Sequence, residues 1–371
     1  MTVKYVSGYL TAPAMSPSGW MRVKSMLFVR VETDDGFIGW GECYTLAHRE
    51  QAMLYLLESL GAVLVGHDAD DVAGFVSRVQ LQIAEQRPGI DLYCVMSGLE
   101  MALWDIRGKR MGKPVYELLG GERRSHRLYL NCWSNLPISI DDMLHKIERA
   151  RERRVDAFKL YPFVFTDDWR EAAELLTELR STIGDEVDIM IDCSRKLDES
   201  RSIEFCRAVE SARLYWFEEP VSSRDAVSLS NIRRQITTPL VSGESVCGLV
   251  EFRTLLHLEA VDIINPDVAC CGGIAELTQI AQLASEQAVE VSPHNYNSML
   301  IGLAASVQVA NALPGKLILE YFEDHVALGQ AFGACDISLD NGSVLSGNTP
   351  GLGVHIEEHK LRELASRVID V

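Results

Sequence analysis

The chain has 371 residues, and its 35 Lys and Arg against 53 Asp and Glu give a formal net charge of −18 at pH 7. A chain this acidic lacks the basic footprint of a protein that binds nucleic acid or an anionic membrane, so we expect neither partner. Its length exceeds what one ordinary core reaches, which predicts one large domain and roughly a hundred further residues.

Signals for export or membrane insertion are missing from the sequence pattern. The first ten residues lack the charged and apolar regions of a secretory signal peptide. The most apolar long stretch, 299–313, contains Gln308 and Asn311 and is too short to cross a bilayer. Nine cysteines without a framework spacing are typical of buried, reduced thiols. We therefore expect a cytoplasmic protein.

The first 125 residues have the pattern of an α+β domain. Apolar alternation over 22–42, with a turn at 34–36, predicts a β-hairpin. Helical periodicity follows over 50–65, 71–85 and 92–111. Strands followed by helices, without alternation between the two, favour an α+β domain over 1–125.

From about residue 128 onward, short apolar runs alternate with turns and helical stretches. The runs cover 128–133, 157–161, 188–192, 215–218, 240–243, 262–265, 290–294 and 317–320. Eight buried strands with intervening helices predict an α/β fold, a TIM-type (β/α)8 barrel over 126–329, with its chemistry at the carboxyl ends of the strands. The last segment, 330–371, has a strand-like stretch, a turn, a Gly/Pro loop and a short final helix. We expect this segment to complete the N-terminal domain.

Three consecutive predicted strands end in an acid: Asp192, Glu218 and Glu244. The spacing is 26 residues in both steps (218 − 192 and 244 − 218), about one βα unit, so the acids should stand at equivalent heights on adjacent strands. Three ionised carboxylates in one opening repel one another, and a divalent cation would remove that cost. Ligation by oxygen alone indicates Mg²⁺, or Mn²⁺, rather than zinc. The alternative is that each acid caps the helix that follows it.

Lys159 and Tyr161 share one face of the second predicted strand, because side chains alternate along a strand. Beside carboxylates, Lys159 could neutralise developing charge or act as a base, and the alternative is a structural ion pair.

Asp267 and His294 end the sixth and seventh predicted strands. A carboxylate next to an imidazole selects its tautomer and stabilises its protonated form, as a general base requires. Glu320 ends the eighth strand and would complete the ring as a hydrogen-bond donor if it is protonated.

Further motifs extend this pattern over nearly the whole chain. They are Gly39-Trp40-Gly41-Glu42, residues 102–109 and 118–121, Glu218-Glu219-Pro220, Gly243-Glu244, Asn265-Pro266-Asp267 and Gly272-Gly273. With them, the sequence resembles the enolase superfamily and, within it, the mandelate racemase subgroup. The resemblance implies an N-terminal α+β domain that caps a modified barrel, in a protein that forms homo-oligomers.

The resemblance also implies roles for individual residues. Asp192, Glu218 and Glu244 would bind one Mg²⁺ per subunit, and the ion would hold the carboxylate of a small-molecule substrate. Glu219 would then be a neighbour of the site rather than a ligand. The pair of Asp267 and His294 would take or deliver protons at one face of the α-carbon.

The strand of Lys159 departs from the family pattern. Members similar to mandelate racemase usually have Lys-x-Lys there, whereas this chain has Lys159-Leu160-Tyr161. A similar tyrosine occurs among the acid-sugar dehydratases of the superfamily. A phenol is a poor base but a usable acid at neutral pH. One base and one acid favour loss of water over racemisation, which needs a base on each face of the α-carbon.

We therefore expect Mg²⁺-dependent removal of the proton α to a carboxylate, through an enediolate, and dehydration of an aldonate or aldarate to a 2-keto-3-deoxy acid. The catalytic residues would be Lys159, Tyr161, Asp267, His294 and Glu320. Cap loops of this family close over the substrate, so the resemblance implies substrate contacts at Trp20 and Tyr44. Positions beside strand ends indicate further contacts at Ser194 and Asn295. A racemase or epimerase, a lactone cycloisomerase and a non-catalytic binding or structural descendant remain alternatives.

Overall fold

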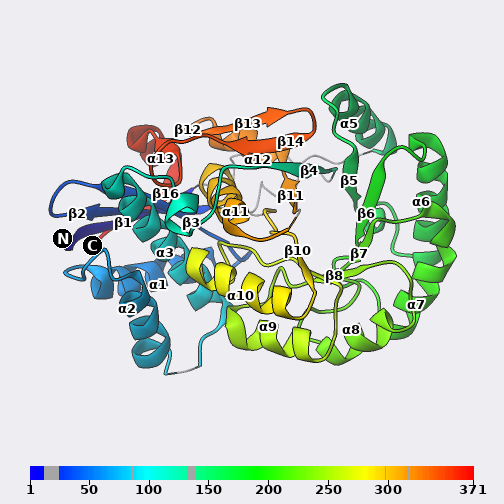
Figure 1. Cartoon of the computed structure of the whole chain (residues 1–371), viewed down its shortest axis with the longest axis horizontal. Coiled ribbons are helices and arrows are strands. Elements are labelled where there is room, and N and C mark those ends of the chain that lie inside the picture. Colours follow the sequence, from blue (N-terminus) through cyan, green and yellow to red (C-terminus); the bar gives the residue numbers. More distant parts are fainter. Residues whose placement is uncertain (12–24, 86, 133–138, 297, 316) are drawn as a thin grey trace.

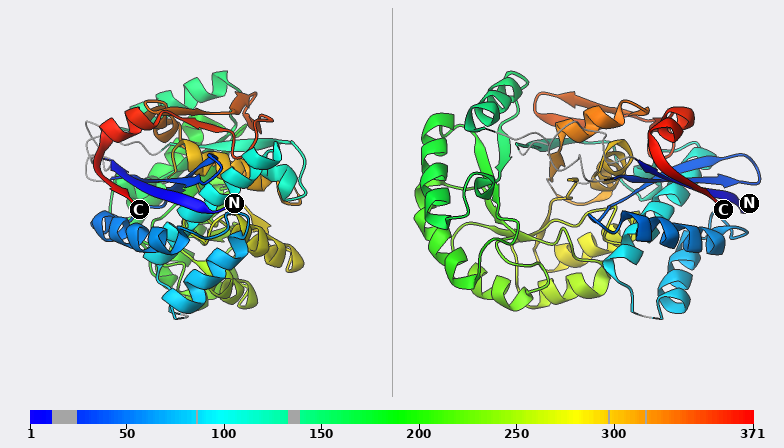
Figure 2. Two further views of the ribbon diagram at one scale, coloured as in Figure 1. Left: turned by 90° about the vertical axis from the view of Figure 1, so that its left-hand side faces the viewer. Right: turned by 180° about the vertical axis from the view of Figure 1, so that it is seen from behind.

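The computed structural model describes residues 1–11, 25–85, 87–132, 139–296, 298–315 and 317–371. A domain made of a sheet and helices lies against one side of a barrel (Figure 1). Both ends of the chain lie in this smaller domain (Figure 2). The architecture confirms the predicted α/β class, with a TIM-type barrel and an N-terminal capping domain.

The capping domain contains a four-stranded antiparallel sheet in the order β16-β1-β2-β3. Its strands are β1 (Val3–Thr11), β2 (Leu27–Thr33), β3 (Ile38–Cys43) and β16 (Ala365–Asp370). Its helical segments are α1 (Glu50–Leu64), α2 (Val72–Arg78), the π-helical turn η3 (Val79–Ile83), α3 (Ile90–Met111) and α4 (Val115–Leu118). The predicted hairpin is present as β2 and β3, which pair antiparallel.

The C-terminal segment returns to this sheet. Helix α13 (Glu358–Leu364) leads directly into β16, which pairs antiparallel with β1. Tyr9 Oη on β1 donates a hydrogen bond to Glu358 Oε1 at 2.8 Å. The sequence pattern predicts the helix but not β16, because a partly exposed edge strand carries only a weak apolar alternation.

Parallel strands of the barrel are β4 (Ser125–Asn131), β5 (Ala157–Leu160), β6 (Asp188–Asp192), β7 (Trp216–Glu218), β8 (Leu240–Ser242), β9 (Ile263–Ile264), β10 (Glu290–Val291) and β11 (Ile318–Tyr321). They pair in the order β10-β9-β8-β7-β6-β5-β4, and β11 pairs with β4. Beyond β10, Ser292 Oγ donates to the carbonyl oxygen of Ile318 at 2.8 Å, which links the two ends of this series. Two small antiparallel pairs follow the barrel, β13 (Ile337–Asp340) with β14 (Ser343–Ser346) and β12 (Gly333–Cys335) with β15 (Val354–Ile356).

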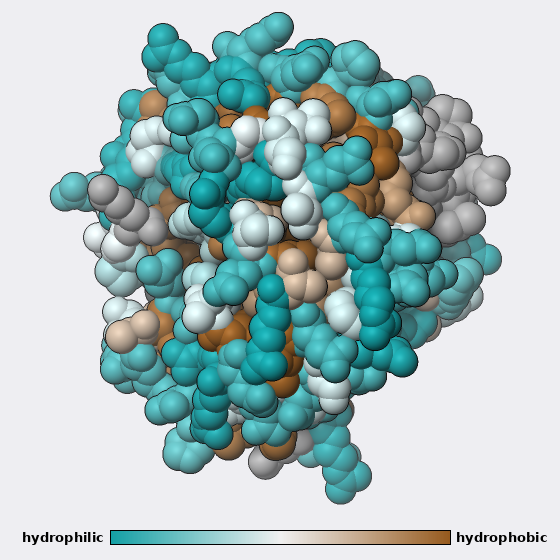
Figure 3. All heavy atoms as spheres, turned by 90° about the vertical axis from the view of Figure 1, so that its right-hand side faces the viewer, coloured by the Kyte–Doolittle hydropathy of each residue, from teal (hydrophilic) through white to brown (hydrophobic). Residues whose placement is uncertain are grey.

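Helices on the outside of the barrel connect these strands (Figures 1 and 2). They are α5 (Ile140–Glu152), α6 (Trp169–Ile183), α7 (Glu199–Ala208), α8 (Ala226–Arg233), α9 (Gly248–His257), α10 (Ile274–Glu286) and α11 (Leu300–Ala312), with short 3-10 turns η4 (Pro162–Val164) and η5 (Glu210–Ala212). Helix α12 (Glu323–Gly329) follows the last barrel strand. The face of the barrel away from the capping domain is mostly hydrophilic, as amphipathic helices with one buried side require (Figure 3). Among the described residues, none of the helices combines the length and hydropathy that spanning a bilayer requires.

Candidate active site

Alternation along the barrel strands creates an apolar floor with a polar layer above it. The floor consists of Tyr129, Ala157, Met190, Trp216, Val241, Ile263 and Ile318, which pack together inside the barrel. Two positions further along six of these strands stand Asn131, Lys159, Asp192, Glu218, Asn265 and Glu320. Residues two apart on a strand share one face, so the polar set follows the floor toward the carboxyl ends of the strands. Barrel enzymes carry their chemistry at this end.

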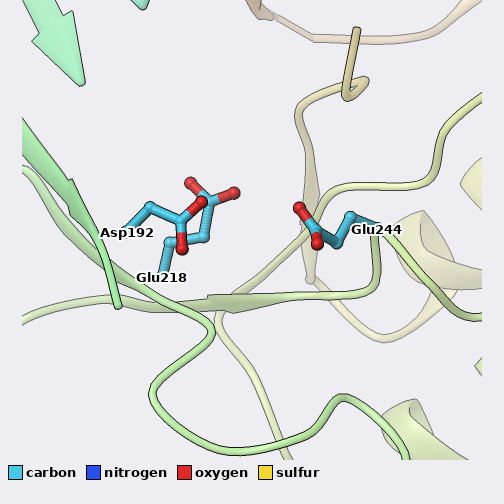
Figure 4. Close-up of side chains that lie close together, drawn as sticks. All are labelled: Asp192, Glu218 and Glu244. Carbon is cyan, nitrogen blue, oxygen red and sulfur yellow. The ribbon is translucent and has the colours of Figure 1, made fainter. Parts of the chain in front are cut away.

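Three acids of this end converge (Figure 4). Asp192 and Glu218 are paired positions on β6 and β7, and Glu244 follows β8 after Gly243. One oxygen from each carboxylate lies within 4.8 Å of the others, and all three residues are buried. This spacing is close to the ~4 Å between opposite oxygen ligands of one Mg²⁺ ion. The acid triad could therefore hold a metal ion.

Burial opposes the ionisation of two members of the triad. It raises the pKa of Asp192 above its ordinary value and raises the pKa of Glu218 to about 8. Burial acts in the same sense on Glu244, but the adjacent His294 outweighs it and lowers the pKa of this carboxyl. A divalent cation among the three carboxylates would offset these costs, which is a further reason to regard the triad as a metal site.

Lys159 is fully buried between two carboxylates. Its Nζ lies 3.1 Å from Glu218 Oε1 and 2.8 Å from Glu320 Oε1. Burial opposes the charge of Lys159, but the two carboxylates outweigh burial and hold its pKa well above the ordinary value. Lys159 is therefore a fixed cation in this structure, suited to neutralising charge and not to accepting a proton.

The same contact decides the protonation state of Glu320. Although burial opposes ionisation, Lys159 and His294 lower the pKa of Glu320 to about 2. Asn131 Nδ2 donates to Glu320 Oε1 at 2.9 Å, and the backbone N–H of Asn295 donates to Oε2 at 2.8 Å. Glu320 is thus an ionised acceptor. This differs from the expectation of a protonated donor, because the sequence does not reveal that Lys159 lies beside it.

Asp267 and His294 form a hydrogen-bonded pair. His294 Nδ1 lies 2.8 Å from Asp267 Oδ2, and the backbone N–H of Ala269 donates to Asp267 Oδ1 at 2.8 Å. The other ring nitrogen, Nε2, lies 3.1 Å from Glu244 Oε2 and 3.8 Å from Glu320 Oε2. Burial opposes the charged imidazole, but the surrounding carboxylates outweigh it and hold the pKa of His294 well above its ordinary value. The ring therefore turns its Nε2 toward the triad.

Tyr161 borders the opposite part of the triad. Its hydroxyl hydrogen bonds to the Asp192 carboxylate, and Lys159 Nζ lies 6.0 Å from its ring centre. Burial and the Asp192 charge raise the pKa of Tyr161 well above its ordinary value. The phenol therefore keeps its proton at neutral pH, which suits an acid and not a base.

Two known domain families match this chain. Residues 142–360 match the family described as enolase C-terminal domain-like, and residues 1–120 match the N-terminal domain of mandelate racemase / muconate lactonizing enzyme. The chain belongs to the mandelate racemase / muconate lactonizing enzyme family. This membership confirms the resemblance that the motifs indicate.

Several proteins are similar to this family member over most of its length. D-galactarolactone cycloisomerase of Agrobacterium fabrum is 28% identical over 95% of each chain. D-galactonate dehydratase of Verminephrobacter eiseniae is 29% identical, with 92% of this chain and 90% of the relative covered. A crystal structure described as an enolase from environmental sequencing of the Sargasso Sea has a TM-score of 0.93 at 27% identity, with 100% and 98% of the two chains covered. The fold is therefore shared along the whole chain.

The substrate contacts expected in this family member occupy different environments. Tyr44 follows β3 of the capping domain, and its ring centre lies 6.3 Å from that of His294. Ser194 is exposed just after β6, and its backbone N–H donates to Asp192 Oδ1 at 2.7 Å. Tyr44 and Ser194 thus lie next to the acid triad or the histidine. Trp20 lies outside the described residues.

Asn295 is buried and bonded within the protein. Its Nδ2 donates to the carbonyl oxygen of Glu320 at 3.2 Å, and its Oδ1 accepts from Ser306 Oγ at 2.6 Å. The side chain therefore supports the site from behind, which differs from the expectation of a substrate contact. The reason is that His294 faces the opening, so the next residue along the chain turns away from it.

Two side chains that the sequence reasoning missed hold Glu218. Asn265 Nδ2 donates to Glu218 Oε1 at 2.9 Å, and Trp216 Nε1 donates to Oε2 at 3.0 Å. Both could have been found from the two-residue spacing along the strands, which places them on the interior face.

Arg195, a polar residue beside the end of β6, contacts two acids of the site. Its Nη1 lies 3.0 Å from Glu219 Oε2 and 3.4 Å from Glu244 Oε1. Arg195 therefore lies between Glu219 and the triad residue Glu244, closer to Glu219. Arg195 reaches this position because Ser194 and Arg195 both adopt left-handed backbone angles (φ 44° and 64°), a feature that no residue spacing predicts.

Proposed function

We propose that this protein is a Mg²⁺-dependent dehydratase of sugar acids, which converts an aldonate or aldarate to the 2-keto-3-deoxy acid. The observation that carries the proposal is the orientation of His294, which pairs with Asp267 through Nδ1 and turns Nε2 to within 3.1 Å of Glu244. Support also comes from relatives named D-gluconate, D-galactonate and D-xylonate dehydratase, which are 27–29% identical over at least 89% of this chain.

The triad of Asp192, Glu218 and Glu244 would hold one Mg²⁺ per subunit, with Mn²⁺ as a substitute. Three buried carboxylates with oxygens within 4.8 Å of one another suit a hard cation. When bound, the ion supplies positive charge beside a substrate carboxylate, where negative charge develops as the α-proton leaves. Neutralising the triad also weakens the field that raises the pKa of His294, so metal loading favours the neutral imidazole.

The residues around the triad divide the chemistry between a base and acids. His294 Nε2 takes the proton from the α-carbon, while Asp267 orients the ring and stabilises the imidazolium. Lys159 offsets the charge of the resulting enediolate. The electron pair then forms the α,β double bond as the bond from the β-carbon to its hydroxyl breaks. Tyr161, or His294 in turn, protonates the departing hydroxide to water, and the enol product becomes the 2-keto-3-deoxy acid.

A panel of aldonic and aldaric acids tests this proposal. The purified protein with Mg²⁺ is incubated with each acid in D₂O, and proton NMR follows both the α-proton and the appearance of a 2-keto-3-deoxy product. Formation of that product from at least one acid is expected. If no acid of the panel loses water, exchange or inversion at the α-carbon would instead indicate a racemase or epimerase.

A lactone cycloisomerase is the second candidate. The galactarolactone cycloisomerase that covers 95% of both chains favours it. Cycloisomerisation keeps every atom of the substrate, whereas dehydration removes one water, so mass spectrometry of the product separates the two reactions. A protein that binds no Mg²⁺ in calorimetry and turns over no acid or lactone would be a non-catalytic descendant.

We also propose a cytoplasmic homo-oligomer. All nine cysteines are free thiols, which suits a reducing compartment. Family membership supports self-association, and light scattering of the purified protein measures it directly.

A further inference from the structure

One buried carboxylate of the capping domain reaches the start of a barrel helix. Glu42, near the end of β3, is fully buried. Its Oε1 accepts a hydrogen bond from the backbone N–H of Met299 at 2.8 Å, and its Oε2 accepts one from Gly302 at 2.9 Å. Both donors belong to the first turn of α11 and its cap, so a residue of the N-terminal domain closes the end of a barrel helix.

Glu100 makes the same kind of contact with the preceding barrel helix. This fully buried residue of α3 accepts hydrogen bonds from the backbone N–H groups of Ile274 and Ala275, at 2.8 Å and 2.9 Å, in the first turn of α10. Trp104 Nε1 donates to the same carboxylate at 2.7 Å. The two glutamates thus hold two consecutive helices.

Helices α10 and α11 have no side-chain cap at their own N-cap positions, which are Gly273 and Met299. The situation is different on the other side of the barrel, where the N-cap side chains of α5 to α8 accept a backbone N–H themselves: Ser139, Asp168, Asp198 and Asp225. The first N–H groups of a helix lack partners within it and favour negative charge. Glu42 and Glu100 therefore supply caps that α10 and α11 do not provide locally.

Helix α11 is connected to the catalytic pair proposed above. It follows His294 in the chain, and Ser306 on its inner side donates to Asn295 Oδ1 at 2.6 Å. Asn295 is the neighbour of His294 and donates through its backbone to Glu320 Oε2. A shift of α11 would therefore move the residue next to the imidazole.

Helix α10 is connected to the other member of the pair. The loop between Asp267 and α10 folds back on itself, with the N–H of Cys271 donating to the carbonyl oxygen of Asp267 at 2.7 Å. Tyr44 of the capping domain donates its backbone N–H to Ala269 in this loop at 3.1 Å. The position of Asp267 thus depends on contacts with the capping domain.

Both glutamates are presented by one rigid unit. Gly39 and Gly41 of β3 allow backbone contact with α3, because a side chain at either position would overlap a carbonyl oxygen of that helix. A side chain at Gly273 would likewise overlap the carboxylate of Glu100. Because no side chains separate β3 from α3, the two elements have little room to move independently. Glu42 on β3 and Glu100 on α3 therefore fix the positions of α11 and α10 relative to each other.

We propose that Glu42 and Glu100 are positioning residues, through which the capping domain sets the relative placement of Asp267 and His294. The inference rests on the proposed function in so far as this pair moves the proton. It separates two parts of the site. The pair depends on the docking of the capping domain, whereas Asp192 and Glu218 end β6 and β7, and the helices that follow these strands, α7 and α8, are capped by their own Asp198 and Asp225.

Proton NMR of the full-length protein with isotope-labelled histidine tests the placement without any turnover. The proton on His294 Nδ1, hydrogen bonded to Asp267, should resonate far downfield, and its absence in His294→Asn assigns it among the nine histidines. Glu42→Gln and Glu100→Gln each should shift this signal or speed its exchange with water. The control Asp225→Ala, which removes the side-chain cap of α8, should leave the signal unchanged.

Kinetics of the Mg²⁺-loaded enzyme give the second readout. Each glutamine variant should lower kcat at least about tenfold while KM and Mg²⁺ affinity stay within about twofold of the wild type, because a misplaced proton acceptor slows chemistry more than binding. Asp225→Ala should keep kcat. If a glutamine variant fails to fold, Ser306→Ala removes the link between α11 and Asn295 and should shift the His294 signal in the same direction.

The two proposals fail in different ways. An unchanged His294 signal with unchanged kcat in both glutamine variants, even with a loss of stability, would overturn the positioning role and leave the dehydratase proposal intact. Absence of turnover by the wild type would contradict the dehydratase proposal, and the NMR comparison would still decide the positioning role.

Discussion

His294 Nδ1 lies 2.8 Å from Asp267 Oδ2, although the two residues are 27 positions apart in the chain. The carboxylate accepts the Nδ1 proton and leaves Nε2 as the nitrogen that exchanges protons. In Asp267→Asn, the amide can donate to Nδ1 and favour the tautomer with its proton on Nε2. We expect kcat to fall at least about 100-fold with little change in Mg²⁺ affinity. Stopped-flow turnover and calorimetry measure the two quantities, and an unchanged kcat would contradict the role of the pair.

Two adjacent glutamates provide a matched test of the metal site. Glu218 belongs to the triad, whereas Glu219 faces Arg195 at 3.0 Å. Glu218→Gln should weaken Mg²⁺ binding at least about 100-fold, because a neutral oxygen replaces an anionic ligand in a buried site. Glu219→Gln should retain most of the affinity. Calorimetric titration compares the two variants, and equal losses would mean that the ligand set is wrong.

Tyr161 separates proton removal from loss of water. Its raised pKa keeps the phenol protonated, so that it has a proton to donate, and Tyr161→Phe should slow dehydration at least about tenfold while exchange of the substrate α-proton with D₂O continues. Proton NMR follows both processes in one sample. Equal losses of exchange and dehydration would instead assign Tyr161 a part in proton abstraction, as the isomerase alternative requires.

Lys159 is expected to stabilise the fold as well as the reaction. Lys159→Met leaves Glu218 and Glu320 buried without their shared cation, at distances that are now 3.1 Å and 2.8 Å from Nζ. The free energy of unfolding without Mg²⁺ should fall by about 3 kcal/mol or more. The double variant Lys159→Met/Glu320→Gln should recover part of that loss, because one of the unpaired charges is removed. Urea unfolding measures both, and a double variant less stable than Lys159→Met would count against this explanation.

The contact between Tyr9 and Glu358 makes docking of the C-terminal segment dependent on pH. Burial and the Glu358 carboxylate raise the pKa of Tyr9 to about 12 in the folded protein. Because the folded value exceeds the unfolded value of about 10, this contribution to stability, at most about 3 kcal/mol, is complete below pH 10 and is lost as the pH rises toward 12. The Tyr9→Phe variant has no hydroxyl to ionise, so its stability does not fall in this way as the pH rises.

The stability difference between wild type and Tyr9→Phe should therefore shrink as the pH rises from 9 to 11. Urea unfolding at several pH values measures it. A constant difference over this range would show that the Tyr9 hydroxyl does not hold the C-terminal segment in the way described.

The sequence by itself determined the architecture and the composition of one end of the barrel. Strand-end acids spaced by one βα unit had to meet, because parallel strands joined by connections of equal length bring their carboxyl ends to the same side. The spacing of Asp192, Glu218 and Glu244 therefore predicts the cluster from the sequence alone. The same spacing predicts that Asp267 and His294 lie at the ends of neighbouring strands.

Only the tertiary structure decided how these groups are partnered. Glu320 is ionised because Lys159 lies beside it, and Asn295 turns inward to Ser306, neither of which follows from residue spacing. The caps that Glu42 and Glu100 place on barrel helices, and the pairing of β1 with β16, join segments from distant parts of the chain. Local patterns report which face of a strand or helix is buried, but contacts between distant segments depend on how the whole chain packs, and protonation states follow from those contacts.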